Sequence, residues 1–250
     1  YESEAMAQDD EKRHGAINTA IIMAFVRDKY LTNDYQSIAS SSEELIGANY
    51  GLIVYRLGAK SFGYLKAYLG ADLFRECMRT YYDTWKYKHP LPGDMKRSFE
   101  ATSGENLSWF FDEILTSTGK LDYSVKKHKE GYELSNIGAI NAPVPMTFTV
   151  GDKASVEWFN VKPGEKLVIT KDSSVSLAVI DVKSKTLDLF TNNNSSKSPY
   201  RLKFGSGRDK ANAKEVYWLP TLGWNAYDRM MVGIGVHNYA LSDKPFQYHV

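Results

Sequence analysis

Residues 49–58 read Asn49-Tyr50-Gly51-Leu52-Ile53-Val54-Tyr55-Arg56-Leu57-Gly58, and they lie in the longest helical pattern of the chain. From about Glu43 to Tyr87, apolar side chains recur with the period of an α-helix. Gly70 divides this stretch into two helices, because glycine commonly ends a helix. The apolar positions are Phe62, Leu65, Leu69, Leu73, Phe74, Met78, Tyr81 and Trp85.

Helices are also predicted on both sides of this stretch. After it, His89-Pro90 break the helix. Asp94 is expected to cap a short helix that Gly104 closes, and Asn106 to cap a last helix. Before it, one buried helical stripe is predicted from Ile17, Ala20, Ile21, Ala24 and Phe25.

The pattern changes near Gly119, where short alternating runs replace the helical period. Strands are predicted over residues 144–150, 155–159 and 174–182, with turns at Gly151-Asp152, Lys162-Pro163-Gly164 and Lys171-Asp172-Ser173. Seven or so strands at this spacing are typical of a small β-sandwich. The Asn- and Ser-rich residues 192–199 are interpreted as the linker that leaves it.

The predicted fold class is therefore α+β, with an N-terminal α-helical lobe followed by a β-sandwich-like module. The lobe is expected over residues 1–118 and the module over residues 119–199. Residues 200–250 either form a β-rich extension of the module or begin a further domain.

Composition excludes several classes of protein. The chain is 43% hydrophobic and 24% charged, which is typical of a globular protein, and its net charge of +1 gives no electrostatic reason to expect nucleic acid or an anionic membrane as a partner. No apolar run approaches the roughly 20 residues of a membrane-spanning helix. The single cysteine, Cys77, excludes an intrachain disulfide and is interpreted as a buried helical residue. Composition does not fix the compartment, and an extracytoplasmic location is preferred.

Complete catalytic or metal motifs are missing. The five histidines, His14, His89, His128, His237 and His249, include no pair three or four residues apart, so no zinc-binding helix is predicted and no metal site is assigned within the chain. No Gly-x-Ser-x-Gly nucleophile motif occurs. The chain starts on Tyr1, inside a predicted helix, and we expect it to be a segment of a longer protein.

The helical stretch nevertheless carries an ordered set of motifs. Tyr50 and Tyr55 open it, Leu69-Gly70-x-x-Leu73-Phe74 follows, and Ser103-Gly104-x-Asn106-Leu107 precedes Trp109-Phe110-Phe111. In this order, residues 50–115 resemble the zinc aminopeptidases of the gluzincin class (aminopeptidase N-like). That family has a Tyr-x-Lys-Gly motif at the start of a helix and a Ser-Gly-x-Asp-Leu-x-x-Phe-Phe helix later.

Two positions depart from the family pattern. Leu57 stands where the family has lysine before glycine, and Asn106 stands in place of the usual aspartate. The His-Glu-x-x-His helix and the downstream glutamate that complete the family's zinc site are not in this chain. The resemblance thus implies the C-terminal half of a metallopeptidase domain followed by its β-module, with zinc held by the longer protein and none bound by residues 1–250.

The resemblance implies one catalytic role, for Tyr55. In the family, the corresponding tyrosine donates a hydrogen bond to the oxyanion formed during peptide hydrolysis, and Tyr50 is placed to shape the same substrate pocket. The alternative is that both are core tyrosines with satisfied hydroxyls. The expected partners are a peptide substrate and the remainder of the peptidase domain, and the isolated chain is expected to be inactive.

A second function remains open from the sequence. The chain could be a metal-free interaction module on a degenerate peptidase scaffold, binding peptide or glycan through aromatic side chains. Trp158, Trp218 and Trp224 are the candidate aromatic contacts for that function.

Overall fold

The computed structural model describes residues 25–26, 29, 34–47, 49–183, 185–188, 190–197, 199–205, 214–227, 229–238 and 248–249. The described residues form helices and three small sheets, which confirms the predicted α+β class. The chain divides into two compact units, one of residues 36–196 and one of residues 1–35 with 197–250. The division into residues 1–118, 119–199 and 200–250 stays a prediction.

The predicted N-terminal stripe falls mostly outside the described residues, because Ile17, Ala20, Ile21 and Ala24 are not among them. Phe25 is helical, as predicted, but its side chain is exposed and that of Val26 is buried. The prediction that Phe25 lies on the buried stripe is therefore wrong. At this point of the chain the buried apolar side chain is Val26 rather than the predicted Phe25.

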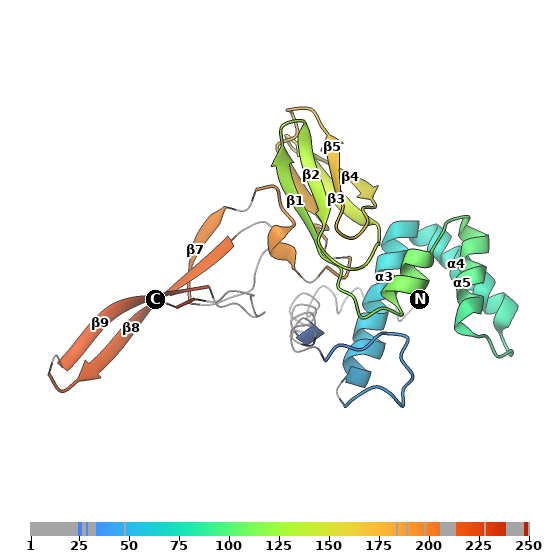
Figure 1. Ribbon diagram of the computed structural model, residues 1–250, viewed down its shortest axis with the longest axis horizontal. Coiled ribbons are helices and arrows are strands. Elements are labelled where there is room, and N and C mark those ends of the chain that lie inside the picture. Colours follow the sequence, from blue (N-terminus) through green and yellow to red (C-terminus); the bar gives the residue numbers. More distant parts are fainter. Residues whose placement is uncertain are drawn as a thin grey trace. The chain divides into compact units, whose positions relative to one another are not determined.

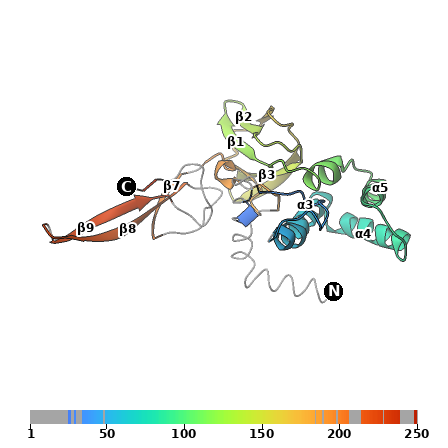
Figure 2. The same ribbon diagram turned by 60° about the horizontal axis from the view of Figure 1, so that its bottom comes forward.

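The helical lobe follows the predicted order. Gly70, with φ of 83°, separates two long helices, and Gly104, with φ of 72°, ends the next one in the left-handed conformation. Figures 1 and 2 both show α4 and α5 side by side. The helical elements are η2 (Tyr50–Leu57), α3 (Gly58–Leu69), α4 (Ala71–Trp85), α5 (Pro92–Ser103) and η3 (Trp109–Ile114).

Neither predicted capping residue is the residue just before its helix. The Asn106 Oδ1 accepts a hydrogen bond from the Ser108 N–H at 2.9 Å, but Ser108 is the residue before η3, so Asn106 lies outside the cap position. Asp94 is not the residue before α5. It lies inside the first turn, where its carboxylate accepts a hydrogen bond from the Leu91 N–H at 2.7 Å. The helix begins at Pro92, earlier than predicted, so Asp94 accepts the Leu91 N–H from a position inside the first turn.

The β-module consists of two three-stranded sheets that pack face to face, with strand orders β1-β2-β5 and β4-β3-β6. Tyr132 and Phe148, one from each sheet, meet across the core with ring centroids 6.0 Å apart. Leu134, Met146 and Ile180 fill the same core. The strands are β1 (Tyr123–His128), β2 (Gly131–Asn136), β3 (Val144–Val150), β4 (Lys153–Phe159), β5 (Lys166–Thr170) and β6 (Leu177–Ile180).

The interpretation of residues 192–199 as a linker is wrong for residues 194–196. The Asn194 carbonyl accepts a hydrogen bond from the Ile180 N–H at 2.7 Å, and the Ser196 N–H donates to the Ala178 carbonyl at 2.9 Å. Ser195 forms a β-bridge with Val179. The Asn- and Ser-rich residues therefore extend the sheet beside β6, because their backbone groups find partners there.

An aromatic contact joins the helical lobe to the β-module. Tyr64 of α3 is fully buried, and its hydroxyl donates a hydrogen bond to the Pro143 carbonyl at the start of β3. Its ring lies 5.1 Å from that of Trp109 and 6.3 Å from that of Trp158 on β4. The Tyr68 ring also contacts Trp158, edge to face, at 5.3 Å. Side chains from η3, α3 and β4 thus form one continuous core.

The second unit contains a separate sheet with strand order β7-β8-β9, formed by β7 (Tyr200–Phe204), β8 (Lys214–Asn225) and β9 (Arg229–His237). β7 and β8 are parallel, and β8 and β9 form an antiparallel hairpin. Trp218 and Trp224 lie on β8 and so belong to this sheet rather than to the sandwich. Among the described residues, no helix has both the length and the apolar character needed to cross a membrane.

The first expected outcome concerns the contact between lobe and module. Tyr64→Phe leaves the buried Pro143 carbonyl without its donor and should lower the free energy of unfolding by about 2 kcal/mol. Urea titration followed by tryptophan fluorescence measures this. Tyr68→Phe is the control, because the Tyr68 hydroxyl meets Glu105 near the surface at 3.3 Å and its loss should cost less than about 0.5 kcal/mol. Equal losses in the two variants would contradict the assigned role of Tyr64.

Candidate active site

Tyr50 and Tyr55 lie side by side because η2 is a π-helix. The Gly58 N–H donates to the Ile53 carbonyl five residues earlier, so one turn of this segment holds an extra residue. In an α-helix, residues five apart would be separated by roughly 140° around the axis. Here the two rings meet edge to face, with centroids 5.7 Å apart and an interplanar angle of 79°. The local helix type therefore pairs the two tyrosines.

The two tyrosines occupy the outer face of this segment. Tyr50 is 41% exposed and Tyr55 is 62% exposed, whereas Ile53 and Leu57 on the inner face are buried. The alternative that both are core tyrosines is therefore wrong. A phenol in such a position can meet a molecule that approaches from solvent.

The neighbouring phenol affects the proton affinity of Tyr50. Side-chain hydrogen bonding with Tyr55 raises the pKa of Tyr50 above its ordinary value, and the nearby Tyr55 charge and slight burial add to the increase. The neutral form of Tyr50 is thus favoured, because it can donate within the pair. The chemical consequence is that Tyr50 keeps its proton more firmly, beside the Tyr55 hydroxyl at the surface of the lobe.

A loop interaction that the sequence did not reveal holds the start of η2. Gln36 Oε1 accepts hydrogen bonds from the Asn49 Nδ2 and the Ile46 N–H, each at 2.9 Å. Gln36 Nε2 donates to the Glu44 carbonyl at 2.7 Å. Asn49, just before the π-helix, is buried. Gln36 and Asn49 are 13 residues apart, and no motif marks the pair, so sequence reasoning had no signal for it.

A metal centre does not fit the residues that can be described. Among them, no group of three or more His, Cys, Asp or Glu side chains is arranged so that it could hold a metal ion. Tyr50 and Tyr55 have no such cluster beside them in the described structure. A zinc ion of the kind that the family resemblance implies would need ligands other than these residues.

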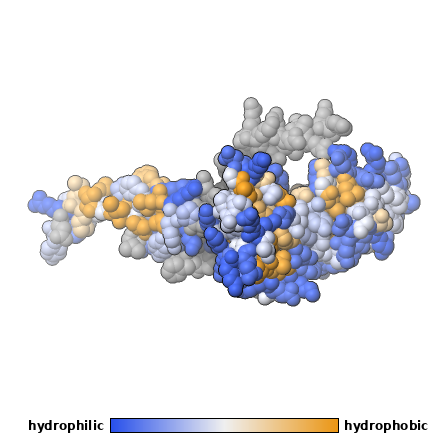
Figure 3. Space-filling view, turned by 90° about the horizontal axis from the view of Figure 1, so that it is seen from above, coloured by the Kyte–Doolittle hydropathy of each residue, from blue (hydrophilic) through white to orange (hydrophobic). Residues whose placement is uncertain are grey.

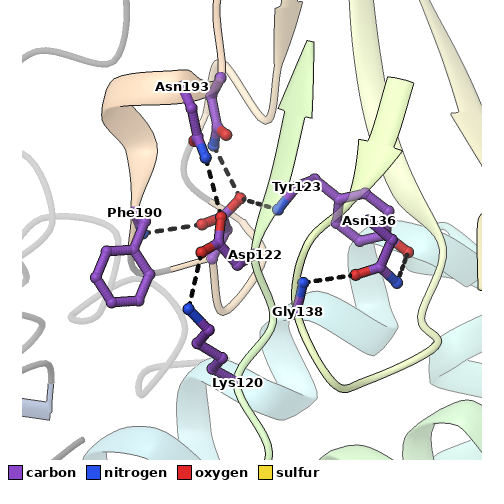
Figure 4. Close-up of polar contacts among 9 residues, drawn as sticks. Lys120, Asp122, Tyr123, Asn136, Gly138, Phe190 and Asn193 are labelled. Atoms are coloured by element: carbon purple, nitrogen blue, oxygen red, sulfur yellow. Dashed lines mark hydrogen bonds and ion pairs between the residues drawn. The ribbon is translucent and has the colours of Figure 1, made fainter. Parts of the chain in front are cut away.

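A second cluster of polar residues lies inside the β-module (Figure 4). The Asp122 carboxylate accepts a hydrogen bond from the Asn193 Nδ2 at 3.0 Å and forms an ion pair with Lys120 at 3.3 Å. Its side chain is almost fully buried. Asp122 therefore connects the start of β1 to the short helix η4 (Thr191–Asn193).

Asp188 is the other carboxylate of this cluster. It accepts hydrogen bonds from the Phe190 N–H at 2.9 Å, the Tyr123 N–H at 3.2 Å and the Asn194 Nδ2 at 3.1 Å. Burial, with the nearby negative charge of Asp122, raises the pKa of the Asp188 carboxyl to about 7. Because all three donors come from the module itself, this cluster fastens the segment after β6 to β1 and is not an open reaction site.

Comparison with solved structures finds chains that are similar to this one. The chain is similar to Legionella pneumophila aminopeptidase A, in a crystal structure with aspartic acid, at 12% sequence identity and a TM-score of 0.45. The similarity covers 62% of this chain and 20% of the Legionella chain, so the chain matches about a fifth of that protein's length. A likeness of this size does not define an activity. No protein-family model and no curated protein matches the chain.

The pairing of the phenols predicts how Tyr50 titrates. In a Tyr55→Phe variant the hydrogen bond is lost, so the pKa of Tyr50 should fall toward the ordinary tyrosine value of about 10. Titration of ¹³Cζ-labelled tyrosine followed by NMR measures it. Tyr82→Phe, on a distant part of α4, should leave the Tyr50 titration unchanged. The same titration in wild type and Tyr55→Phe would disprove the coupling.

The buried Asp188 predicts a pH-dependent stability. Because its folded pKa lies above the unfolded value, its contribution is full below about pH 4 and is lost as pH rises through about 7. The difference in unfolding free energy between wild type and Asp188→Asn should therefore fall between about pH 5 and about pH 8, by at most ~3 kcal/mol. Urea titrations at both pH values measure this difference. A difference that stays constant with pH would contradict the raised pKa.

Proposed function

We propose that residues 1–250 are part of a longer zinc-dependent, aminopeptidase-like metallopeptidase that hydrolyses peptide bonds, with Tyr55 as an oxyanion-stabilising residue. The observation that carries the proposal is the pair of solvent-facing phenols, in contact edge to face, at the head of α3. The motif order over residues 50–115, which resembles the gluzincin aminopeptidases, supports the same assignment. Zinc and its ligands belong to the remainder of that protein.

The chemistry of Tyr55 follows from where negative charge develops during hydrolysis. When water attacks a peptide carbonyl, the carbonyl oxygen becomes an oxyanion. A phenol hydroxyl that donates to this oxygen stabilises the transition state more than the substrate. Tyr55 is the more exposed of the two phenols, which supports its assignment, rather than that of Tyr50, as the donor to the substrate oxygen.

Tyr50 has a positioning role in this proposal. Its ring rests edge to face against the Tyr55 ring. This contact restricts the rotation of Tyr55, so that less entropy is lost when the hydroxyl binds the substrate oxygen. Tyr50 also forms one wall of the surface that a peptide would approach.

The alternative function, a metal-free peptide- or glycan-binding module, has less support from the aromatic residues proposed for it. Trp158 is half-buried and packs against Tyr64 and Tyr68, so it serves the contact between lobe and module. Trp218 and Trp224 belong to the separate sheet of β7 to β9. The three tryptophans therefore do not form one binding face on the sandwich.

Substitution of Tyr55 in the longer, zinc-containing protein tests the proposal. Tyr55→Phe removes the donor and should lower kcat by about a hundredfold with little change in KM, because the bond forms mainly in the transition state. Steady-state hydrolysis of aminoacyl-nitroanilide substrates measures both constants.

Tyr82→Phe is the matched control, because Tyr82 is 63% exposed and Tyr55 62% exposed, and both lie on the helical lobe. This variant should hydrolyse substrate as fast as wild type. Circular dichroism checks that both variants remain folded. An unchanged kcat in folded Tyr55→Phe would rule out the catalytic role, and a protein without peptidase activity would favour the binding module.

A further inference from the structure

The loop of residues 36–47 leads the chain into η2, and Gln36 is the centre of its hydrogen bonds. Gln36 is also the first residue of the compact unit 36–196. Its Oε1 accepts from the Asn49 Nδ2 and the Ile46 N–H, each at 2.9 Å, and its Nε2 donates to the Glu44 carbonyl at 2.7 Å. One side chain therefore ties the two ends of the loop to the residue just before the π-helix.

Asn49 uses its side chain to hold this loop rather than to cap the helix. An asparagine just before a helix normally accepts a hydrogen bond from a backbone N–H of the first turn. Among the described residues, Asn49 makes no such cap to η2. Its Nδ2 donates to Gln36 instead, and the residue is only 2% exposed. A buried amide that is directed at the loop fixes the start of η2 against Gln36.

The same loop also reaches the far end of η2. The Ile38 Cγ2 lies 3.9 Å from the position that a Cβ on Gly58 would take, and Gly58 is where η2 passes into α3. The Ala39 N–H donates to the Leu115 carbonyl at 2.8 Å, at the end of η3. The loop therefore meets η2 at both ends and is itself fastened to η3.

Contacts at both ends matter because η2 is π-helical. An α-helix of the same residues would turn further around its axis, so one end of the segment would have to rotate against the other. The contacts at Asn49 and Gly58 oppose that rotation. The edge-to-face contact of Tyr50 and Tyr55, with centroids 5.7 Å apart, depends on the π-turn and thus on these contacts.

We propose that Gln36 is a positioning residue for the reaction, which acts through Asn49 to keep the π-turn and so holds Tyr55 beside Tyr50. This inference rests on the proposed function of Tyr55. Gln36 acts on the phenol rather than on the substrate. A phenol that is already held in place loses less entropy when it donates to the oxyanion. The positioning group therefore lies outside the motif that contains the two tyrosines.

Substitution of Gln36 tests the proposal in two measurements. In the deuterated 250-residue chain with protonated tyrosine rings, an NOE between Tyr50 and Tyr55 reports their contact. Gln36→Leu removes all three hydrogen bonds, and this NOE should be lost. In the longer, zinc-containing protein, the same substitution should lower kcat about tenfold with little change in KM, because the phenol is retained but less well placed.

Two further variants separate positioning from general stability. Gln36→Glu keeps an oxygen for the Asn49 and Ile46 donors and gives up only the donation to the Glu44 carbonyl, so it should retain the NOE and most of kcat. Ile38→Ala removes the contact at the far end of η2 and should weaken the NOE without any change at Gln36. Circular dichroism checks that each variant is folded.

Ser41→Ala is the matched control within the loop, because the Ser41 hydroxyl meets the neighbouring Glu43 N–H, at 3.4 Å, and lies at neither end of η2. Val232→Ser is a control in the other unit. Val232 of β9 lies opposite Leu222 of β8, and the two are 72% and 75% exposed. Figure 3 shows hydrophobic side chains gathered where Figure 1 labels β8 and β9. Both variants should keep the NOE.

The outcomes separate this inference from the proposed function. Loss of the NOE and a lower kcat in Gln36→Leu, with both retained in Gln36→Glu, support the positioning role. An NOE that persists in folded Gln36→Leu overturns it. A kcat that falls in Tyr55→Phe but not in Gln36→Leu also overturns it and leaves the function of Tyr55 standing. If Tyr55→Phe leaves kcat unchanged, the proposed function fails, and the NOE decides separately whether Gln36 holds the two rings together.

Discussion

The burial of Tyr64 between the helical lobe and the β-module is the contact on which the arrangement of residues 36–196 depends. Tyr64 lies six residues after Gly58 on α3, its ring packs between Trp109 and Trp158, and its hydroxyl donates to the Pro143 carbonyl. The position of α3 against the sandwich also fixes η2, which continues directly into α3. The surface phenols are therefore held by a core contact that lies away from them.

The sequence predicts those parts of the fold that depend on local periodicity. Helices α3 to α5, their ends at Gly70 and Gly104, and strands β3 and β4 all follow from side-chain spacing and turn residues. The predicted strand over residues 174–182 is shorter in the structure, Leu177–Ile180, because Asp181 takes a positive φ of 46° and ends it. A positive φ at a non-glycine residue is set by its surroundings, which local patterns do not contain.

Contacts between distant residues could not be predicted in this way. Tyr123 and Asp188 are 65 positions apart, and Tyr64 and Pro143 are 79 apart. Nothing in either segment marks its partner. The candidate site was likewise only partly predictable. The family resemblance indicated Tyr50 and Tyr55, but their exposure and ring contact depend on the π-helix, which the sequence did not predict. Strand periodicity likewise predicts two different faces for β8 and β9, but not which one is turned outward.

The π-helical turn at residues 50–57 has a consequence for how related sequences can differ. An α-helix tolerates many substitutions but is put out of phase by an added or missing residue, whereas a π-turn can lose one residue and become α-helical. Removing Arg56 or Leu57 would leave α3 in place and carry Tyr50 away from Tyr55 around the axis, because the two tyrosines would stay five residues apart in an α-helix. A related sequence can therefore keep the helical scaffold and still separate the two hydroxyl groups through the deletion of one residue. A substitution within the π-turn would not have this effect.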